Sequence, residues 1–210
     1  MLLVAVSDTH GAHDRVTVPP CDLLIHAGDL TRKGKLDELV AACDWLAAQS
    51  ARHKVFIAGN HDKICERDPN AVRGVAITRG LTYLCDETIE LEGLRIHGSP
   101  VTPWFRGMAF NRARGPVIAE AWARIPVGVD VLVTHGPPHR VGDRMILGPH
   151  VGCADLRERL RIVAPKVHLF GHIHEAHGTY LDPEFPGTRF FNVATRRLAF
   201  GVNPPVVVEC

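Results

Sequence analysis

The sequence predicts a single α/β domain with mixed β-sheets. Short runs rich in Val, Ile and Leu recur along the chain and stop at a glycine or a polar residue, which is typical of buried strands. Segments with helical periodicity alternate with these runs. Two further stretches have the pattern of hairpins, so antiparallel pairs are expected beside parallel ones. The chain has 210 residues, with no linker or low-complexity tract, so residues 1–210 are expected to form one domain.

The first half of the chain contains three strand-like runs, one helix and one hairpin. The runs are residues 2–10 (LLVAVSDTH), 22–29 (DLLIHAGD) and 54–62 (KVFIAGNHD). Residues 35–49 predict an amphipathic helix, because their apolar side chains recur three and four positions apart. Residues 83–100 (YLCDETIELEGLRIHGSP) predict a hairpin.

The second half repeats the alternation. Residues 115–125 predict a short helix, with a proline near its first turn, and residues 153–163 predict a second one with Leu156, Leu160 and Val163 on one face. Strand-like runs occupy 130–138 (DVLVTHGPP) and 166–174 (KVHLFGHIH). Residues 188–195 and 204–210 read as two more strands, and we expect this tail to form a hairpin.

The composition indicates a globular protein without a strong electrostatic preference. The hydrophobic fraction is 46%, the charged fraction is 22% and the formal net charge is +1. No global field therefore favours nucleic acid or a membrane. The opening apolar run, Leu2 to Val6, lacks a basic flank and is too short for a signal peptide or a membrane span. The sequence carries no signal for an oligomeric state.

The cysteines predict neither a disulfide framework nor a zinc site. Six are scattered along the chain, and no two form a C-x-x-C pair. With no export signal recognised, we expect reduced thiols in a cytoplasmic protein, most of them buried as small apolar side chains.

Polar side chains follow five of the predicted strands at the point where each strand ends. Ligands of α/β sheets bind beyond the carboxyl ends of the strands, so we expect these side chains to converge. In an extended chain, residues two apart share a face, so Asp8 and His10 can reach one point. His172 and His174 have the same spacing, unless a turn directs them to two adjacent ions. The converging residues are Asp8, His10, Asp29, Asn60, His135, His172 and His174.

This set of side chains suits a pair of divalent transition-metal ions. Carboxylates and neutral imidazoles bind Mn, Fe, Zn or Co, and seven candidate ligands exceed the three or four of a single zinc site. Two cations about 3.5–4 Å apart can share a bridging carboxylate, and such a pair lowers the pKa of a bound water from about 15.7 to about 7. The resulting hydroxide can attack a phosphorus atom whose oxygens the metals hold, and the residual positive charge would attract an anionic substrate.

Five motifs together resemble those of the calcineurin-like metallophosphoesterase superfamily. They are SDTHG (7–11), HAGDL (26–30), AGNHD (58–62), VTHGPP (133–138) and FGHIHE (170–175). The segments 98–115, 152–156 (GCADL) and 190–195 (FFNVAT) are similar to a branch of metallophosphoesterase-domain proteins first noticed in brain, with bacterial relatives. The resemblance covers most of the chain. It implies two mixed β-sheets packed as a sandwich flanked by helices.

The resemblance also implies a role for each candidate residue. Asp29 would bridge two metal ions, and His61 would be the catalytic residue near the leaving-group oxygen rather than a ligand. Asp62 is a candidate for orienting His61. The first metal would take Asp8, His10 and His174, and the second would take Asn60, His135 and His172.

Residues 99–115 predict a loop over the metal site. Trp104 and Phe105 can stack on a base, and arginines can pair with phosphate; the candidate substrate-binding residues are Trp104, Arg106 and Arg114. The alternative is that the aromatic rings pack the loop and the arginines are solvated. Three other histidines are expected outside the centre, with His26 and His168 in the core and His177 in a solvated loop.

The function that best fits these features is a manganese-dependent phosphodiesterase acting on small diesters, including cyclic nucleotides, by attack of a metal-bound hydroxide. The expected partner is a small phosphoester substrate. A phosphomonoesterase is the alternative among enzymes, and a nucleotide-binding scaffold with little activity is the alternative outside them. A DNA nuclease is disfavoured, because the sequence has no basic stripe.

Overall fold

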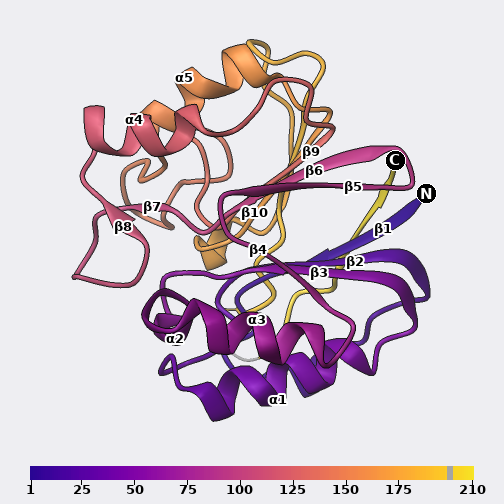
Figure 1. The fold of residues 1–210 in the computed structure, drawn as a ribbon. Helices are drawn as coiled ribbons and strands as arrows, with labels where there is room; N and C mark the ends of the chain where they lie inside the picture. The colour runs from indigo at the N-terminus through magenta and orange to yellow at the C-terminus, as the bar shows by residue number, and fades with distance from the viewer. Residues whose placement is uncertain (198–200) are drawn as a thin grey trace.

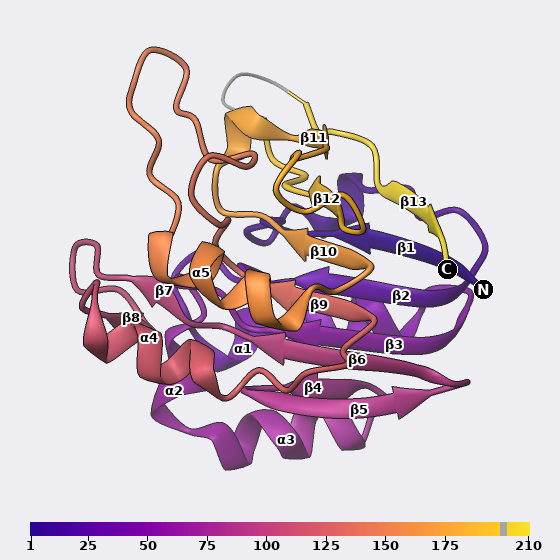
Figure 2. The same ribbon diagram turned by 90° about the horizontal axis from the view of Figure 1, so that it is seen from above.

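Two β-sheets packed face to face, with helices on both outer sides, make up the protein (Figure 1). The structure is a computed structural model that describes residues 1–197 and 201–210. The predicted α/β class is confirmed, and so is the sandwich of mixed sheets that the resemblance implied. Figure 2 shows the layers from above, with the N- and C-terminal ends of the chain side by side.

The first sheet has five strands in the order β13-β1-β2-β3-β4. Four of them run parallel, and β13 pairs antiparallel with β1. The strands are β1 (Leu2–Val6), β2 (Cys21–Ala27), β3 (Ala51–Ile57), β4 (Thr82–Leu84) and β13 (Val206–Glu209).

The second sheet has six strands in the order β11-β12-β10-β9-β6-β5. Its four central strands are parallel, and its two edge strands are antiparallel to their neighbours. The strands are β5 (Glu87–Leu91), β6 (Leu94–Ser99), β9 (Val131–Thr134), β10 (Val167–Phe170), β11 (Gly178–Tyr180) and β12 (Arg189–Asn192). In the predicted loop, β7 (Thr102–Pro103) and β8 (Asn111–Arg112) form a separate short pair.

One predicted hairpin is present and the other is wrong. Within residues 83–100, β5 and β6 form an antiparallel pair closed between Leu91 and Leu94. In the tail, by contrast, β12 and β13 lie in different sheets. Because β10 and β11 already occupy both edges of β12, β13 pairs instead with the open edge of β1, where the amino group of Met1 donates to the carbonyl of Cys210 at 2.7 Å.

Within residues 1–197 and 201–210, five helices cover the outer faces of the sheets. The three predicted helices are found within two residues of their expected ends, whereas α2 and α3 were not predicted. The local signal for α3 is Asp68, whose side chain accepts from the Ala71 amide, followed by Pro69 in the first turn. The helices are α1 (Leu36–Ala47), α2 (Lys63–Arg67), α3 (Pro69–Ile77), α4 (Pro116–Ala123) and α5 (Ala154–Val163), with 3-10 turns η1 (His13–Arg15) and η2 (His174–Ala176).

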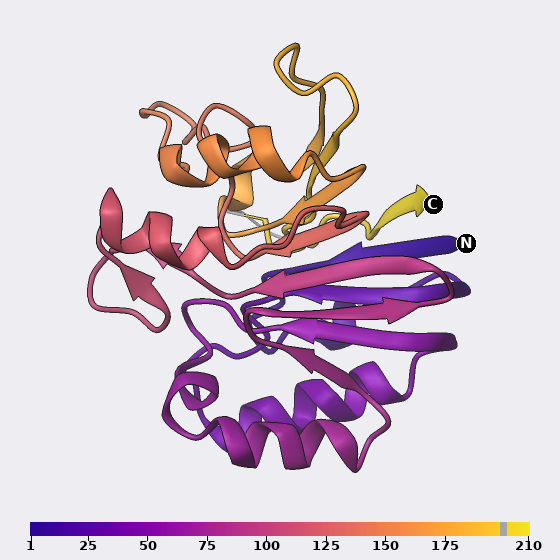
Figure 3. The same cartoon turned by 45° about the horizontal axis from the view of Figure 1, so that its top comes forward.

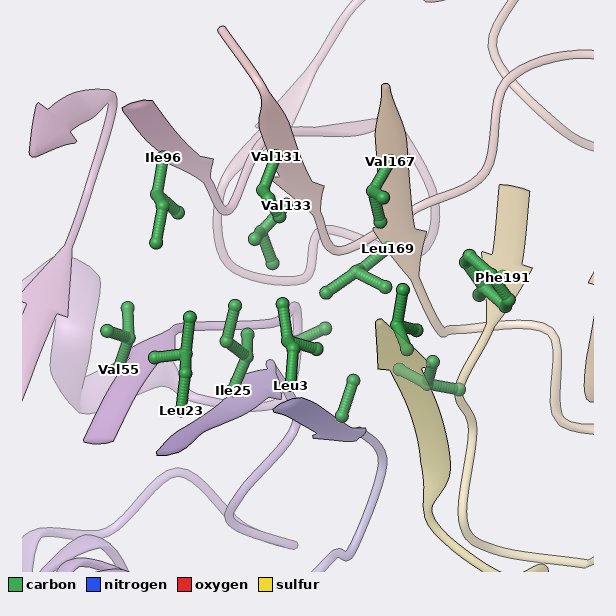
Figure 4. Packing of buried hydrophobic residues seen from close by; sticks show 14 of the residues in the cluster. Leu3, Leu23, Ile25, Val55, Ile96, Val131, Val133, Val167, Leu169 and Phe191 are labelled. Atoms are coloured by element: carbon green, nitrogen blue, oxygen red, sulfur yellow. The ribbon is translucent and has the colours of Figure 1, made fainter. Parts of the chain in front are cut away.

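A layer of aliphatic side chains joins the two sheets. Alternate residues of each strand point inward, so Leu3 and Ala5 enter this layer while Val4 packs beneath the helices. Figure 4 shows the side chains of the two sheets facing one another across it. The labelled residues are Leu3, Leu23, Ile25, Val55, Ile96, Val131, Val133, Val167, Leu169 and Phe191. Burial of this apolar surface holds the two sheets together. The carboxyl ends of the parallel strands of both sheets lie at the same edge of the sandwich (Figure 2).

The cysteines were expected to be reduced and mostly buried. All six cysteines are free: Cys43, Cys65 and Cys153 are buried as expected, Cys21 and Cys85 are partly buried, and Cys210 is exposed. Among the residues that the structure describes, no helix has the length and apolar character needed to cross a membrane.

His168 is a core histidine of β10, as expected. It is fully buried, and its Nε2 lies 2.8 Å from Thr134 Oγ1. That hydroxyl donates its own proton to the carbonyl of Gly136, so His168 Nε2 must be the donor to it. Burial lowers the pKa of His168 to about 3. The ring is therefore neutral in the folded protein at pH values where an unfolded histidine is charged.

The burial of His168 predicts a pH-dependent loss of stability. The folded pKa lies below the unfolded value of about 6.5, so the stability contributed by the neutral ring decreases as the pH falls from about 6.5 towards about 3. In His168→Phe, the free energy of unfolding should fall less steeply than in the wild type, by about 1 kcal/mol per pH unit below pH 6. Urea unfolding at several pH values between 6 and 4 measures the difference, and parallel curves would contradict it.

Candidate metal centre

The loops that follow β1, β2, β3, β9 and β10 bring the predicted side chains together at one edge of the sandwich. Ligand atoms of Asp8, His10 and His174 lie within 4.8 Å of one another, as do those of Asp8, Asp29 and His135. Asn60 and His172 both contact His135 and so lie in the same group. Figure 3 shows β7 and β8 beside the same edge, so the loop of residues 99–115 lies near the centre.

One cluster of donors surrounds Asp8. His174 Nε2 lies 3.3 Å from Asp8 Oδ1, and His10 Nε2 lies 4.0 Å from the same oxygen. The other oxygen, Oδ2, accepts from the backbone amide of His172 at 2.9 Å. Asp8 has no exposed surface, and His10 is 8% exposed. These three side chains are the ones expected to hold the first metal.

Asp29 lies between this cluster and a second one. Its Oδ2 is 3.6 Å from His10 Nε2 and 3.4 Å from His135 Nε2, so one carboxylate oxygen faces both groups. Its Oδ1 accepts from the backbone amide of His61 at 2.7 Å. This is the position that a bridging carboxylate requires.

The second cluster centres on His135. Its Nε2 lies 2.9 Å from Asn60 Oδ1, while its Nδ1 lies 3.0 Å from the carbonyl of Ala27. The ring of His172 packs against that of His135 with a centroid separation of 5.1 Å. His172 and His174 therefore point to different clusters, because the turn after β10 separates them.

The backbone of four of these residues is left-handed. The φ angles are 54° at Asp8, 45° at His10, 56° at Asp29 and 68° at His172. Strand β1 ends at Val6, so Asp8 and His10 approach each other through a turn and not through the extended chain expected from the sequence. Non-glycine residues with this conformation are uncommon and concentrate at functional sites, where the surrounding structure holds them.

Glycines let the donors approach one another. A Cβ atom at Gly59 would meet Asp29 Oδ1 and would lie 2.6 Å from His135 Cε1. A Cβ atom at Gly171 would meet the other carboxylate, at Asp8 Oδ2. Both carboxylates are thus packed against backbone that has no room for a side chain.

The charges of the centre are strongly coupled. Burial alone would raise the pKa of Asp29, but His135 lowers it to about 2. Burial alone would lower the pKa of His135, but Asp29 and Asp8 raise it to about 10. The neighbouring histidines likewise hold the pKa of Asp8 well below its usual value against the effect of burial. Burial lowers the pKa of His172 to about 4, so this imidazole is neutral, as a metal ligand must be.

The donor set fits divalent cations. Among the residues that the structure describes, none donates a hydrogen bond to the buried Asp8 Oδ1, and the Nε2 atoms of His10 and His174 face each other at 3.3 Å. Such an arrangement leaves lone pairs directed at the same point, which a cation would satisfy. Carboxylates, imidazoles and an amide oxygen without cysteine are typical ligands of Mn, Fe, Zn and Co.

His61 lies beside the donors and is oriented by a backbone carbonyl. Its ring packs edge-on against that of His10 at 4.7 Å, and its Nδ1 lies 3.1 Å from the carbonyl of Arg32. Asp62, the candidate for orienting His61, makes different contacts. Its carboxylate accepts from the amides of Leu30, Thr31 and Gly59 and from the Thr31 hydroxyl, so it holds the two loops in place. The Arg32 carbonyl had no sequence signal, because any residue supplies that group.

Two hollows adjoin the donors. One, of about 350 Å³, opens at His172 and is lined by Trp104, Phe105 and Arg114. The guanidinium of Arg114 donates to the carbonyls of Val151 and Gly152. Arg106 lines neither hollow and stacks on Phe105 at 4.9 Å. The other hollow, of about 380 Å³, opens at Asp8 and His10.

Two other histidines near the centre play structural parts. His26 is buried in β2, with its Nε2 3.0 Å from Thr9 Oγ1, as expected of a structural residue. His177 lies in the connection between η2 and β11, as expected of a loop residue. It is partly buried, and its Nδ1 lies 3.1 Å from the carbonyl of Ala194.

The packing around Gly59 predicts that Gly59→Ala weakens metal binding. The added methyl group would displace Asp29 or His135, so the affinity for Mn²⁺ should fall at least about tenfold, as measured by equilibrium dialysis. Gly74→Ala in α3 is the matched control, because its Cβ atom would meet nothing within 4 Å. Equal manganese content in the two variants would show that Gly59 is not needed to hold the donors.

The chain has counterparts among known proteins. Residues 1–176 match the family model described as "Calcineurin-like phosphoesterase". The chain is 36% identical over 233 residues to "Metallophosphoesterase domain-containing protein 1" of Homo sapiens, covering 98% of this chain and 70% of that protein. It is 35% identical over 208 residues to "UPF0046 protein K07C11.7" of Caenorhabditis elegans, covering 91% of this chain and 69% of that protein.

The fold has counterparts among solved structures. The crystal structure of TT1561 of Thermus thermophilus superposes with a TM-score of 0.68 at 13% identity, covering 91% of this chain and 88% of the other. The family match and the relatives above one-third identity lead to one conclusion. This chain belongs to the calcineurin-like phosphoesterase family.

Proposed function

We propose that the protein is a phosphodiesterase that uses two divalent metal ions to hydrolyse small diesters, including cyclic nucleotides. Manganese is the proposed metal. Family membership supports a metal-dependent phosphoesterase. The observation that favours a diester is the pair of hollows, one opening at Asp8 and His10 and the other at His172. A diester has a substituent on each side of phosphorus, whereas a monoester has only one.

In this proposal, Asp8, His10 and His174 hold one metal ion, Asn60, His135 and His172 hold the other, and Asp29 contacts both. When bound, such a pair of ions supplies a nucleophile from water at neutral pH and neutralises charge on the phosphate oxygens. The chain positions the donors through the left-handed turns and the glycine contacts. The carbonyl of Ala27, 3.0 Å from His135 Nδ1, directs Nε2 of that ring toward Asn60 and Asp29.

His61 is proposed to act on the leaving group. With Nδ1 donating to the Arg32 carbonyl, protonation at Nε2 gives an imidazolium whose second proton is available to the departing oxygen. The Asp29 carboxylate fixes the His61 backbone by accepting its amide at 2.7 Å. Because Asp29 is also the proposed bridging ligand, this hydrogen bond fixes the position of His61 relative to the proposed metal sites.

The aromatic hollow is the proposed place for an apolar or heterocyclic substituent. Trp104 is 66% exposed, so its ring is available to stack on a base, whereas Phe105, at 52% exposed, already has Arg106 stacked on its ring. Arg114 lines the same hollow, although part of its donor capacity is directed to backbone carbonyls. Trp104 and Arg114 are therefore the proposed substrate contacts. Arg106 is not proposed as a contact, because it stacks on Phe105 and lines neither hollow.

The diester proposal predicts a preference between paired substrates. With Mn²⁺ present, kcat/KM for bis(4-nitrophenyl) phosphate should exceed that for 4-nitrophenyl phosphate by at least about tenfold, because only the diester fills both hollows. Nucleoside 2′,3′- and 3′,5′-cyclic phosphates are assayed alongside. A preference for the monoester would establish the phosphomonoesterase alternative. Absence of turnover in a protein with two bound metals would favour the scaffold alternative.

The role of His61 predicts that chemistry and metal binding separate in His61→Ala. This variant should bind the same amount of manganese as the wild type but lose about 100-fold or more in kcat, because the leaving group is no longer protonated. His53→Ala is the matched control, since His53 lies in β3 and pairs with Glu92 at 3.1 Å, away from the donors. Unchanged kcat in His61→Ala would remove His61 from the reaction.

A further inference from the structure

Four arginines line the hollow that opens at Asp8 and His10. They come from three separate segments: Arg15 ends η1, Arg32 lies in the loop after β2, and Arg196 and Arg197 follow β12. All four are exposed. None belongs to a motif that the sequence analysis used, and none is among the metal donors. The hollow therefore contains a cluster of positive charge that metal binding does not require.

Among the described residues that line this hollow, Asp8 is the only carboxylate, and it is fully buried and directed to the metal donors. Within the described residues, no Asp or Glu lies within 4.0 Å of the four guanidinium groups. Some cations elsewhere in the described chain do have a carboxylate partner, namely Arg52, Arg73, Arg79, Arg112, Arg124, Arg157, Arg161 and Lys166. Four uncompensated like charges around one hollow create a field that favours an anion.

Contacts with the rest of the chain hold parts of this cluster in place. Arg197 Nε donates to Asn203 Oδ1 at 2.9 Å, and the backbone of Arg196 forms a bridge with Val202. The carbonyl of Arg32 is the group that orients His61. The arginine hollow thus adjoins the proposed reaction centre, because Asp8 and His10 line it together with the arginines.

We infer that the substrate carries a second phosphate, separate from the reacting phosphorus, and that this phosphate binds in the arginine hollow. The inference rests on the proposed function, since it places the reacting phosphate at the metal donors. Guanidinium groups bind phosphate oxygens through paired charge-assisted hydrogen bonds. The two hollows then divide the substrate: a heterocyclic group lies against Trp104 and Phe105, and the second phosphate lies against the arginines. The substrate class is a nucleotide diester that bears an additional phosphate.

The test compares ligands that differ by one phosphate. Binding of adenosine 3′,5′-bisphosphate, adenosine 5′-monophosphate and adenosine 3′-monophosphate is measured by calorimetry on manganese-loaded His61→Ala protein, in which any turnover of the ligands is slowed. The bisphosphate should bind at least about tenfold tighter than either monophosphate. Adding Arg15→Gln and Arg196→Gln should abolish this advantage and leave the Kd values of both monophosphates unchanged.

The control removes the same charge elsewhere. Arg67→Gln with Lys166→Gln, in the same background, should keep the full advantage of the bisphosphate, because neither residue lines the hollow. Equal Kd values for all three ligands would overturn the inference. A loss of affinity for the monophosphates equal to that for the bisphosphate would also overturn it, since the arginines would then hold the reacting phosphate. These outcomes concern binding, so they are independent of whether diesters or monoesters are hydrolysed.

Discussion

The centre depends on the burial of two carboxylates, Asp8 and Asp29, side by side. Buried charges of like sign are costly unless they are compensated by hydrogen bonds and opposite charge. Here the compensation comes from His135 and His174, and from backbone amides, which donate to both carboxylates. Even so, no donor to Asp8 Oδ1 is found in the described part of the chain. Divalent cations would complete this compensation, so the electrostatics of the folded chain and its affinity for metal have the same origin.

The sandwich supplies the rigidity that such a centre needs. Its aliphatic layer fixes the two sheets against each other, and bonds between the sheets continue at the edge where the donors lie. The amide of Thr195, after β12, donates to the carbonyl of Ser7, after β1, at 2.8 Å. The turns beyond that edge hold Asp8, His10 and Asp29 in left-handed conformations. A stable frame is what permits strained backbone at the donors, because the strain is small beside the energy of the surrounding packing.

The fold class and the clustering of the candidate ligands were predictable from the sequence, because both have local signatures. Val/Ile/Leu runs mark the strands, and Asp29 or Asn60 follows a glycine at a strand end. The pairing of β13 with β1 was not predictable, since it joins opposite ends of the chain and depends on which strand edge is open. The arginine hollow had no signature either, because Arg15, Arg32 and Arg196 meet only when three loops fold together. For α3, the Asp68–Pro69 start was a usable local signal.

The central claim is that residues distant in sequence hold two cations that share Asp29. Crystals grown with excess manganese, examined by anomalous diffraction at the manganese absorption edge, test it directly. Two peaks about 3.5–4 Å apart should flank the Asp29 carboxylate, one beside His174 and the other beside His172. A single peak, or two peaks of which only one contacts Asp29, would contradict the account.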